Sequence, residues 1–149
     1  MGSKRNMRVK LANERNAEIE KRKVLDTTKK ALFYLKAAKA DLDSAFRWGV
    51  IDIVGGVYIV STVKHLKVES AKKNLREAMF WLQQLRNKND TTDYVNQKYM
   101  HLGPLGMGLD IGLDGIGPDI YAQTRIAGLR SRVKEAIRRV EAILAQVDH

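Results

Sequence analysis

Apolar side chains recur at alternating steps of three and four residues in three stretches of the chain, and this spacing places them on one face of an α-helix. The first stretch begins at Val24 and is predicted to end near Arg47, because Gly49 follows the last periodic residue. The second covers residues 67–88, and the third runs from Pro118 to about Ala145 or beyond. The pattern therefore predicts three amphipathic helices. Each has an apolar stripe along one face, which we call its seam, that packs against neighbouring helices.

The segment before Val24 contains good helix formers but few large apolar side chains. These are Met7, Val9, Leu11 and Ile19. Such a composition is typical of a helix that frays or bridges solvent, not of a core element. We expect residues 1–23 to form a frayed or protruding basic helix. A cap near Asp26 could separate it from the next helix, or one helix could run through.

An apolar stretch from Trp48 to His65, WGVIDIVGGVYIVSTVKH, separates the first two predicted helices, and we call it the pivot. Its β-branched residues and the Gly55-Gly56 pair are compatible with a β-hairpin. An isolated hairpin is marginally stable and the flanking sequence is helical, so we favour a broken or short buried helix. Asp52 interrupts the apolar run, so the pivot falls short of the roughly 18 apolar residues of a transmembrane helix.

A glycine-rich connection covers residues 94–118 and precedes the last predicted helix. It is too apolar to be a solvated flexible linker. With its three seams, the sequence predicts an all-α fold, which is an antiparallel helical bundle or a coiled-coil hairpin of three main helices. The length of 149 residues fits a single helical domain, residues 1–149.

The charge of the chain is strongly positive and unevenly distributed. The sequence has a net charge of +10, and residues 1–48 hold 13 Lys and Arg residues against six Asp and Glu residues. A basic surface of this kind attracts nucleic acid, anionic lipid or an acidic partner, although it can also be a solvated face that keeps a protein soluble. The chain has no cysteine, which excludes disulfides, thiolate metal sites and thiol nucleophiles and is compatible with the predicted cytoplasmic location.

Five polar residues are candidates for a shared cluster if the pivot packs on the start of the last helix. They are Asp52, Lys64, His65, Asp119 and Gln123. A buried hydrogen-bonded cluster that fixes helix register is the commoner use of such residues, and a catalytic cluster would also need a pocket. No second histidine lies one helical turn from His65, which argues against a zinc site. We predict no catalytic, cofactor-binding or metal site. Trp48 and Trp81 are candidate interface residues.

The pivot and the start of the third helix also carry short motifs. WGVIDIVGG, STVKHLKVESA and DGIGPDIYAQTRI resemble the WG-x-x-D-x-x-GG, T-x-x-KH and DG-x-x-x-D-x-x-x-Q-(S/T)-(R/K)-I segments of an uncharacterised bacterial family of helical proteins. The likeness covers about residues 40–145, and Val57 departs from it where the family often has a third glycine. The positions assigned to the motifs are Trp48, Gly49, Asp52, Gly55, Gly56, Thr62, Lys64, His65, Asp114, Gly115, Asp119, Gln123 and Arg125, although only one residue, Val63, separates Thr62 from Lys64 where the pattern has two. The resemblance implies a bacterial source and a helical architecture but no reaction.

Three functions are compatible with these features. The first is a non-enzymatic helical module that acts through protein contacts, by self-association or as a scaffold, because the seams are the strongest signal in the chain. The alternative is electrostatic binding of nucleic acid or an anionic membrane through the basic N-terminal helix. A second alternative is an enzyme that uses Asp52, Lys64 and His65.

Overall fold

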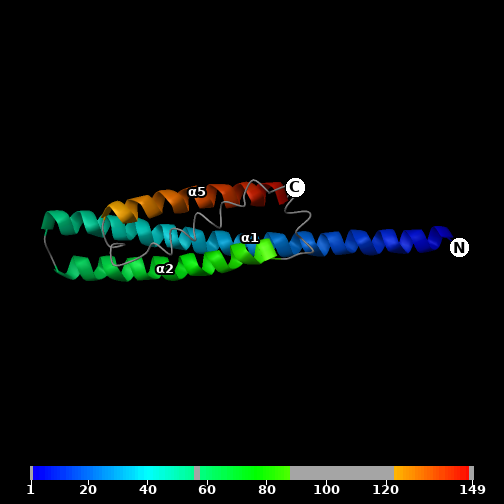
Figure 1. Ribbon diagram of the computed structural model, residues 1–149, viewed down its shortest axis with the longest axis horizontal. Helices are drawn as coiled ribbons and strands as arrows, with labels where there is room; N and C mark the ends of the chain where they lie inside the picture. The colour runs from blue at the N-terminus through cyan, green and yellow to red at the C-terminus, as the bar shows by residue number, and fades with distance from the viewer. Residues whose placement is uncertain (1, 56–57, 88–122, 148–149) are drawn as a thin grey trace.

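The computed structural model describes residues 2–55, 58–87 and 123–147, and all of them are helical. Helix α1 (Gly2–Gly55) packs against both α2 (Tyr58–Asn87) and α5 (Gln123–Val147). Figure 1 shows that α2 and α5 both run antiparallel to α1, which lies between them in that view. The predicted all-α bundle of three main helices is therefore confirmed for the described residues.

The predicted end of the first helix near Arg47 is wrong, because α1 continues to Gly55. Gly49 is buried and lies seven residues after the buried Leu42, so it occupies the next position of the same seam. A glycine in a helix interior costs only about 1 kcal/mol, and packing along the seam outweighs that cost. The local stop signal was thus weaker than the tertiary contacts.

The helix also runs through the possible cap near Asp26 without interruption. Thr28 is buried, and its Oγ1 donates a 2.6 Å hydrogen bond to the carbonyl oxygen of Val24 one turn earlier. A threonine that bonds back to the preceding turn satisfies its hydroxyl inside a helix and does not act as an N-cap. One continuous helix of 54 residues results.

The pivot is helical wherever the structure describes it. Helix α1 ends at Gly55 and α2 begins at Tyr58, nine residues before the predicted start at residue 67. The β-hairpin alternative is wrong for these residues, and the broken helix is the correct interpretation of them. The predicted helix start at Pro118 and the glycine-rich connection lie outside the described residues, and α5 ends at Val147, two residues beyond the expected Ala145.

Large and small side chains alternate where α1 meets α2. The two hydrogen bonds from Ser70 and Asn74 to Asp41 fix the antiparallel register of α1 and α2. In this register each alanine of one helix is level with a larger residue of the other, which means that the two residues lie at the same height along the helix pair. The pairs at one level are Ala31 with Leu82, Leu35 with Ala78, Ala38 with Leu75, Leu42 with Ala71, and Ala45 with Val68. All ten side chains are buried, as expected where a large residue of one helix fills the space left by a small residue of the other.

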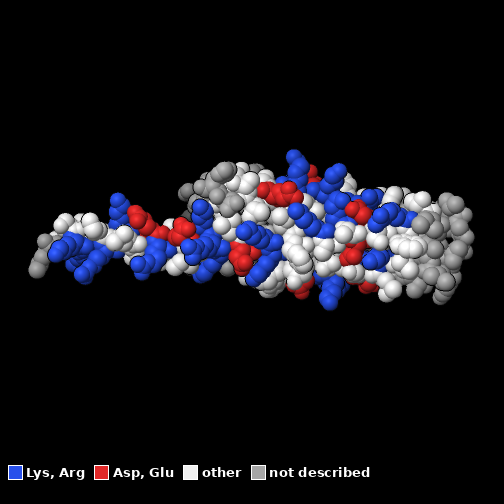
Figure 2. Space-filling model, turned by 180° about the vertical axis from the view of Figure 1, so that it is seen from behind, with Lys and Arg blue, Asp and Glu red and all other residues white. Residues whose placement is uncertain are grey.

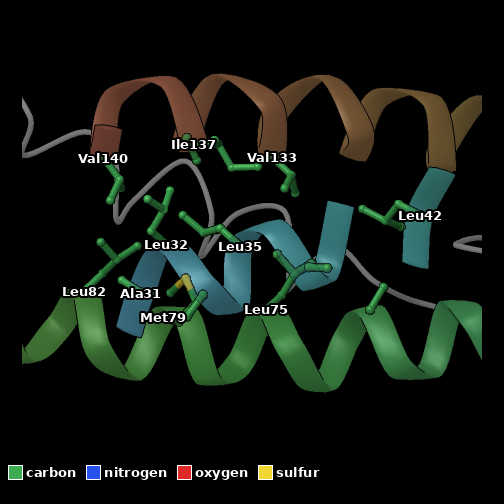
Figure 3. Packing of buried hydrophobic residues seen from close by; sticks show 14 of the residues in the cluster. Ala31, Leu32, Leu35, Leu42, Leu75, Met79, Leu82, Val133, Ile137 and Val140 are labelled. Carbon is green, nitrogen blue, oxygen red and sulfur yellow. The ribbon is translucent and has the colours of Figure 1, made fainter. Parts of the chain in front are cut away.

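Helix α5 closes the other side of α1. Val133, Ile137 and Val140 point toward Leu32 and Leu35 in Figure 3, and all five are buried. Burying a leucine or isoleucine side chain contributes about 2 kcal/mol. The core is therefore a continuous strip along the inner faces of the three helices.

The N-terminal part of α1 extends beyond the bundle (Figure 1). At about 1.5 Å per residue, α1 is about 80 Å long and α2 about 45 Å. Every residue from 2 to 19 is exposed. We call residues 2–19 the N-terminal extension.

Candidate functional site

The structure places two side chains of the predicted polar cluster, and they differ in exposure. Lys64 is buried and the neighbouring His65 is exposed, since successive helix residues are about 100° apart. Asp52 lies in α1 and Gln123 begins α5, but their side chains are outside the described part, and Asp119 lies outside the described residues altogether. Convergence of the five therefore stays a prediction.

Lys64 occupies a seam position of α2. It precedes the buried Val68 by one helical turn, and only 8% of its surface is exposed. The register of α1 and α2 sets it level with the buried Gly49. Lys64 is thus a charged residue at a position that belongs to the core pattern.

A polar contact that sequence reasoning missed joins α1 to α2. Asp41 Oδ2 accepts a 2.6 Å hydrogen bond from Ser70 Oγ and a 2.9 Å hydrogen bond from Asn74 Nδ2. Both donors lie on the same face of α2, one turn apart. The contact holds the two helices in register, which is a structural role.

A second missed contact joins α1 to α5 on the opposite side of Leu42. Asp43 accepts hydrogen bonds of 2.7 Å from Lys39 Nζ and from Arg130 Nε, and the Arg130 guanidinium also lies 4.4 Å from the centre of the Phe46 ring. Burial acts to raise the pKa of Asp43, but the hydrogen bonds and charges of Lys39 and Arg130 outweigh it and lower that pKa below its usual value. The usable signal was an Asp on each side of the seam residue Leu42.

The two tryptophans predicted as interface residues are both half-buried. Trp81 packs against the core, and Lys30 Nζ lies 4.5 Å from the centre of its ring. The Trp81 indole Nε1 is buried without a hydrogen-bond partner in the part of the chain that the structure describes. Trp48 follows Asp41 by seven residues and so lies on the side of α1 that faces α2. Their role in contacts with another protein stays a prediction.

The N-terminal extension differs from the bundle in its seam. The α1 seam that carries Val24, Thr28 and Ala31 in the bundle continues backward at the same spacing into three charged residues and one alanine. These seam positions are Lys10, Glu14, Ala17 and Lys21. Because these positions form no apolar stripe, this face of the extension cannot pack against another helix as the seam of the bundle does. The change of polarity coincides with the end of the exposed segment.

The described residues contain no group of three or more His, Asp or Glu side chains arranged to hold a metal ion. None of the helices in the described ranges is long and apolar enough to cross a lipid bilayer.

Comparisons of the chain with protein-family models, with curated proteins and with solved structures find no match. The resemblance to the bacterial helical family therefore stays a prediction.

Proposed function

We propose that the protein is a non-enzymatic interaction module in which the bundle holds α1 and presents the N-terminal extension to a binding partner. The observation that carries this proposal is the exposure of every residue from 2 to 19 in a helix that is continuous with the core. A fully exposed segment contributes no burial to the stability of the bundle, but it offers a long preformed surface for binding.

Two further features support the proposal. Four large apolar side chains of the extension are exposed and available for contact. They are Met7, Val9, Leu11 and Ile19. The polar contacts around Asp41 and Asp43 join helices to one another, which favours a structural use of these carboxylates over catalysis.

The experiment is photo-crosslinking from two exposed leucine positions. A photoreactive residue at Leu11, in the extension, is compared with one at Leu66 on α2, where the side chain is also exposed. We expect position 11 to give a defined adduct, with a second copy or with another protein, and position 66 to give none. Deletion of residues 2–19 should abolish the partner's co-purification. Equal labelling from both positions, together with a strict monomer in sedimentation at high concentration, would contradict the proposal.

We propose electrostatic binding of a polyanion as a second candidate function. The extension contains five Lys and Arg residues against two Glu residues, and all are exposed. The basic residues are Lys4, Arg5, Arg8, Lys10 and Arg15. Neutralising a polyanion releases its counterions, so binding should weaken steeply as salt is raised. Absence of binding to DNA, RNA and acidic vesicles at low salt would rule this function out.

The enzyme alternative has less support. It requires Asp52, Lys64 and His65 to act together, yet Lys64 is buried in the seam and His65 is exposed. Replacing both with Gln tests it directly, because an activity that depended on them would be lost.

A further inference from the structure

We propose that the outward face of α1 binds the surface of an anionic lipid bilayer, with the helix lying flat on the headgroups. This inference rests on the second candidate function above and names its partner. It assigns the binding surface to a line of side chains that extends from the N-terminal extension onto the bundle.

Five basic residues are spaced seven apart along α1. They are Arg8, Arg15, Arg22, Lys29 and Lys36, and we call them the basic ridge. Seven residues rise about 10.5 Å, so the ridge is about 42 Å long. Lys29 and Lys36 each precede a buried seam alanine, Ala31 or Ala38, by two residues, which is about 200° around the helix. Lys29 and Lys36 therefore lie on the side of α1 turned away from α2, where Lys36 borders α5, and all five ridge residues are exposed.

Most of the ridge is not engaged in ion pairs. Lys36 Nζ lies 3.6 Å from Glu141 Oε1, but both side chains are about half exposed. The other four ridge residues form no ion pair with the described part of the chain. Figure 2 shows Lys and Arg side chains along the extension and on the adjoining part of the bundle. Their charge is available to an external anion.

Exposed apolar side chains alternate with the ridge residues. Leu11 lies between Arg8 and Arg15 at steps of three and four. Ile19 lies between Arg15 and Arg22, and Phe33 between Lys29 and Lys36, at the same steps in reverse order. Their exposed fractions are 55%, 45% and 66% respectively, and Asp26 occupies the one remaining interval. The outward face thus has a second seam, in which an apolar residue lies between basic residues in three of four intervals, and the acidic residues on it are Glu18 and Asp26.

This second seam fits a lipid surface better than a nucleic acid. On a bilayer, basic side chains pair with lipid phosphates while apolar side chains insert at the boundary of headgroups and acyl chains. A nucleic-acid backbone would satisfy the basic residues but would offer Leu11, Ile19 and Phe33 no apolar environment.

The test is co-flotation of the full chain with vesicles of phosphatidylcholine, with and without phosphatidylserine. The ridge variant is Arg8→Gln with Arg15→Gln. Its matched control, Lys10→Gln with Lys21→Gln, removes the same charge from the far side of the helix. Each neutralised ridge charge should lower vesicle partitioning about fivefold, so the ridge variant should bind about 25-fold more weakly. The control should lose less than about fivefold, because screening limits charges on the far side.

A second matched pair tests the apolar part of the surface. Leu11 and Val9 have nearly equal exposed fractions, 55% and 56%, but Val9 lies on the other side of the helix. We expect Leu11→Gln to weaken binding about fivefold, since about half of a leucine side chain loses its burial. Val9→Gln should change binding less than about twofold. Circular dichroism should show that all four variants keep the helical fold of the parent.

Three outcomes would overturn the inference. They are no binding to phosphatidylserine vesicles at low salt, equal losses in the ridge variant and its control, and tighter ridge-dependent binding of a DNA or RNA duplex than of vesicles. The last would retain the polyanion function and change its partner. Crosslinking from position 11 without any vesicle binding would leave the protein-interaction function standing while this inference fails.

Discussion

Lys64 is a charged residue in the position of a core residue. Only 8% of its surface is exposed, and it lies on the same face of α2 as the buried seam residues Val68, Ala71 and Leu75. Removing an ammonium from water costs free energy that only a close partner returns. Methionine has a flexible stem of similar length and a comparable helix propensity, so it can occupy the same space without the charge.

We therefore predict that Lys64→Met raises the free energy of unfolding by about 1 kcal/mol. The measurement is urea denaturation followed by circular dichroism. Lys73→Met on the exposed side of α2 is the control and should change stability by less than about 0.5 kcal/mol. A loss of stability in Lys64→Met would show that the ammonium makes a favourable contact.

Asp43 links the stability of the bundle to pH. Its pKa is lower in the folded protein than in the unfolded chain, where an Asp titrates near about 4. A group with a depressed pKa stabilises the folded state above the unfolded value, and this contribution is lost as pH falls through the folded value. Glu135, which is held by Arg138 and Arg139 with a pKa of about 2, acts in the same direction.

We predict that the stability difference between the parent and Asp43→Asn is largest at neutral pH and shrinks as pH falls below about 4. Its size should be about 0.5–1 kcal/mol, because the carboxylate is partly exposed and its ion pairs are screened. Urea denaturation over a pH series measures it. Arg130→Gln should reproduce most of the same pH dependence, and a difference that stays constant with pH would contradict the assignment to Asp43.

At the scale of the helix pair, the alternation of large and small residues specifies how α1 meets α2. Ala38 is fully buried and level with Leu75, so a leucine at position 38 would compete with Leu75 for one space. We predict that Ala38→Leu lowers stability by about 2 kcal/mol and Leu75→Ala by about 3 kcal/mol. The double variant restores one large and one small residue at this level. Its loss of stability should therefore be smaller than the sum of the losses in the two single variants.

Thermal and urea denaturation of the four proteins in this cycle would measure the coupling. Ala40→Leu lies on the exposed side of α1 and should be nearly neutral. Additive losses in the double variant would mean that Ala38 and Leu75 do not share a level.

The same seams explain which parts of the fold were predictable. Three-four spacing identified the bundle helices because seam burial dominates their stability, and the exposed composition of α1 before Val24 is visible in the sequence itself. The predicted helix end near Gly49 was wrong because a single glycine carries no information about the residues that pack around it in the fold. The contacts of Asp41 and Asp43 were missed for a related reason. Their partners Asn74 and Arg130 are distant in sequence, and only the register brings them together.

At the scale of the whole molecule, α1 has two parts with different energetics. From Val24 onward its residues share a core with α2 and α5, whereas residues 2–19 are exposed throughout. A helix without tertiary contacts is marginally stable in water, since its backbone hydrogen bonds alone barely exceed the cost of ordering it. The extension should therefore open locally much more often than the bundle unfolds.

We predict that deleting residues 2–19 changes the free energy of unfolding of the bundle by less than about 0.5 kcal/mol. In the full chain, amide hydrogens of the extension should exchange much faster than those around Leu35 and Leu42, which are fully buried in the same helix. Hydrogen exchange followed by mass spectrometry makes both comparisons on one sample series. Slowing of exchange at residues 2–19 when phosphatidylserine vesicles are added would report binding there, because a bound helix cannot open without first leaving the surface. If the deletion instead destabilised the bundle by several kcal/mol, the extension would have to pack against the bundle, and a surface presented to partners would no longer describe it.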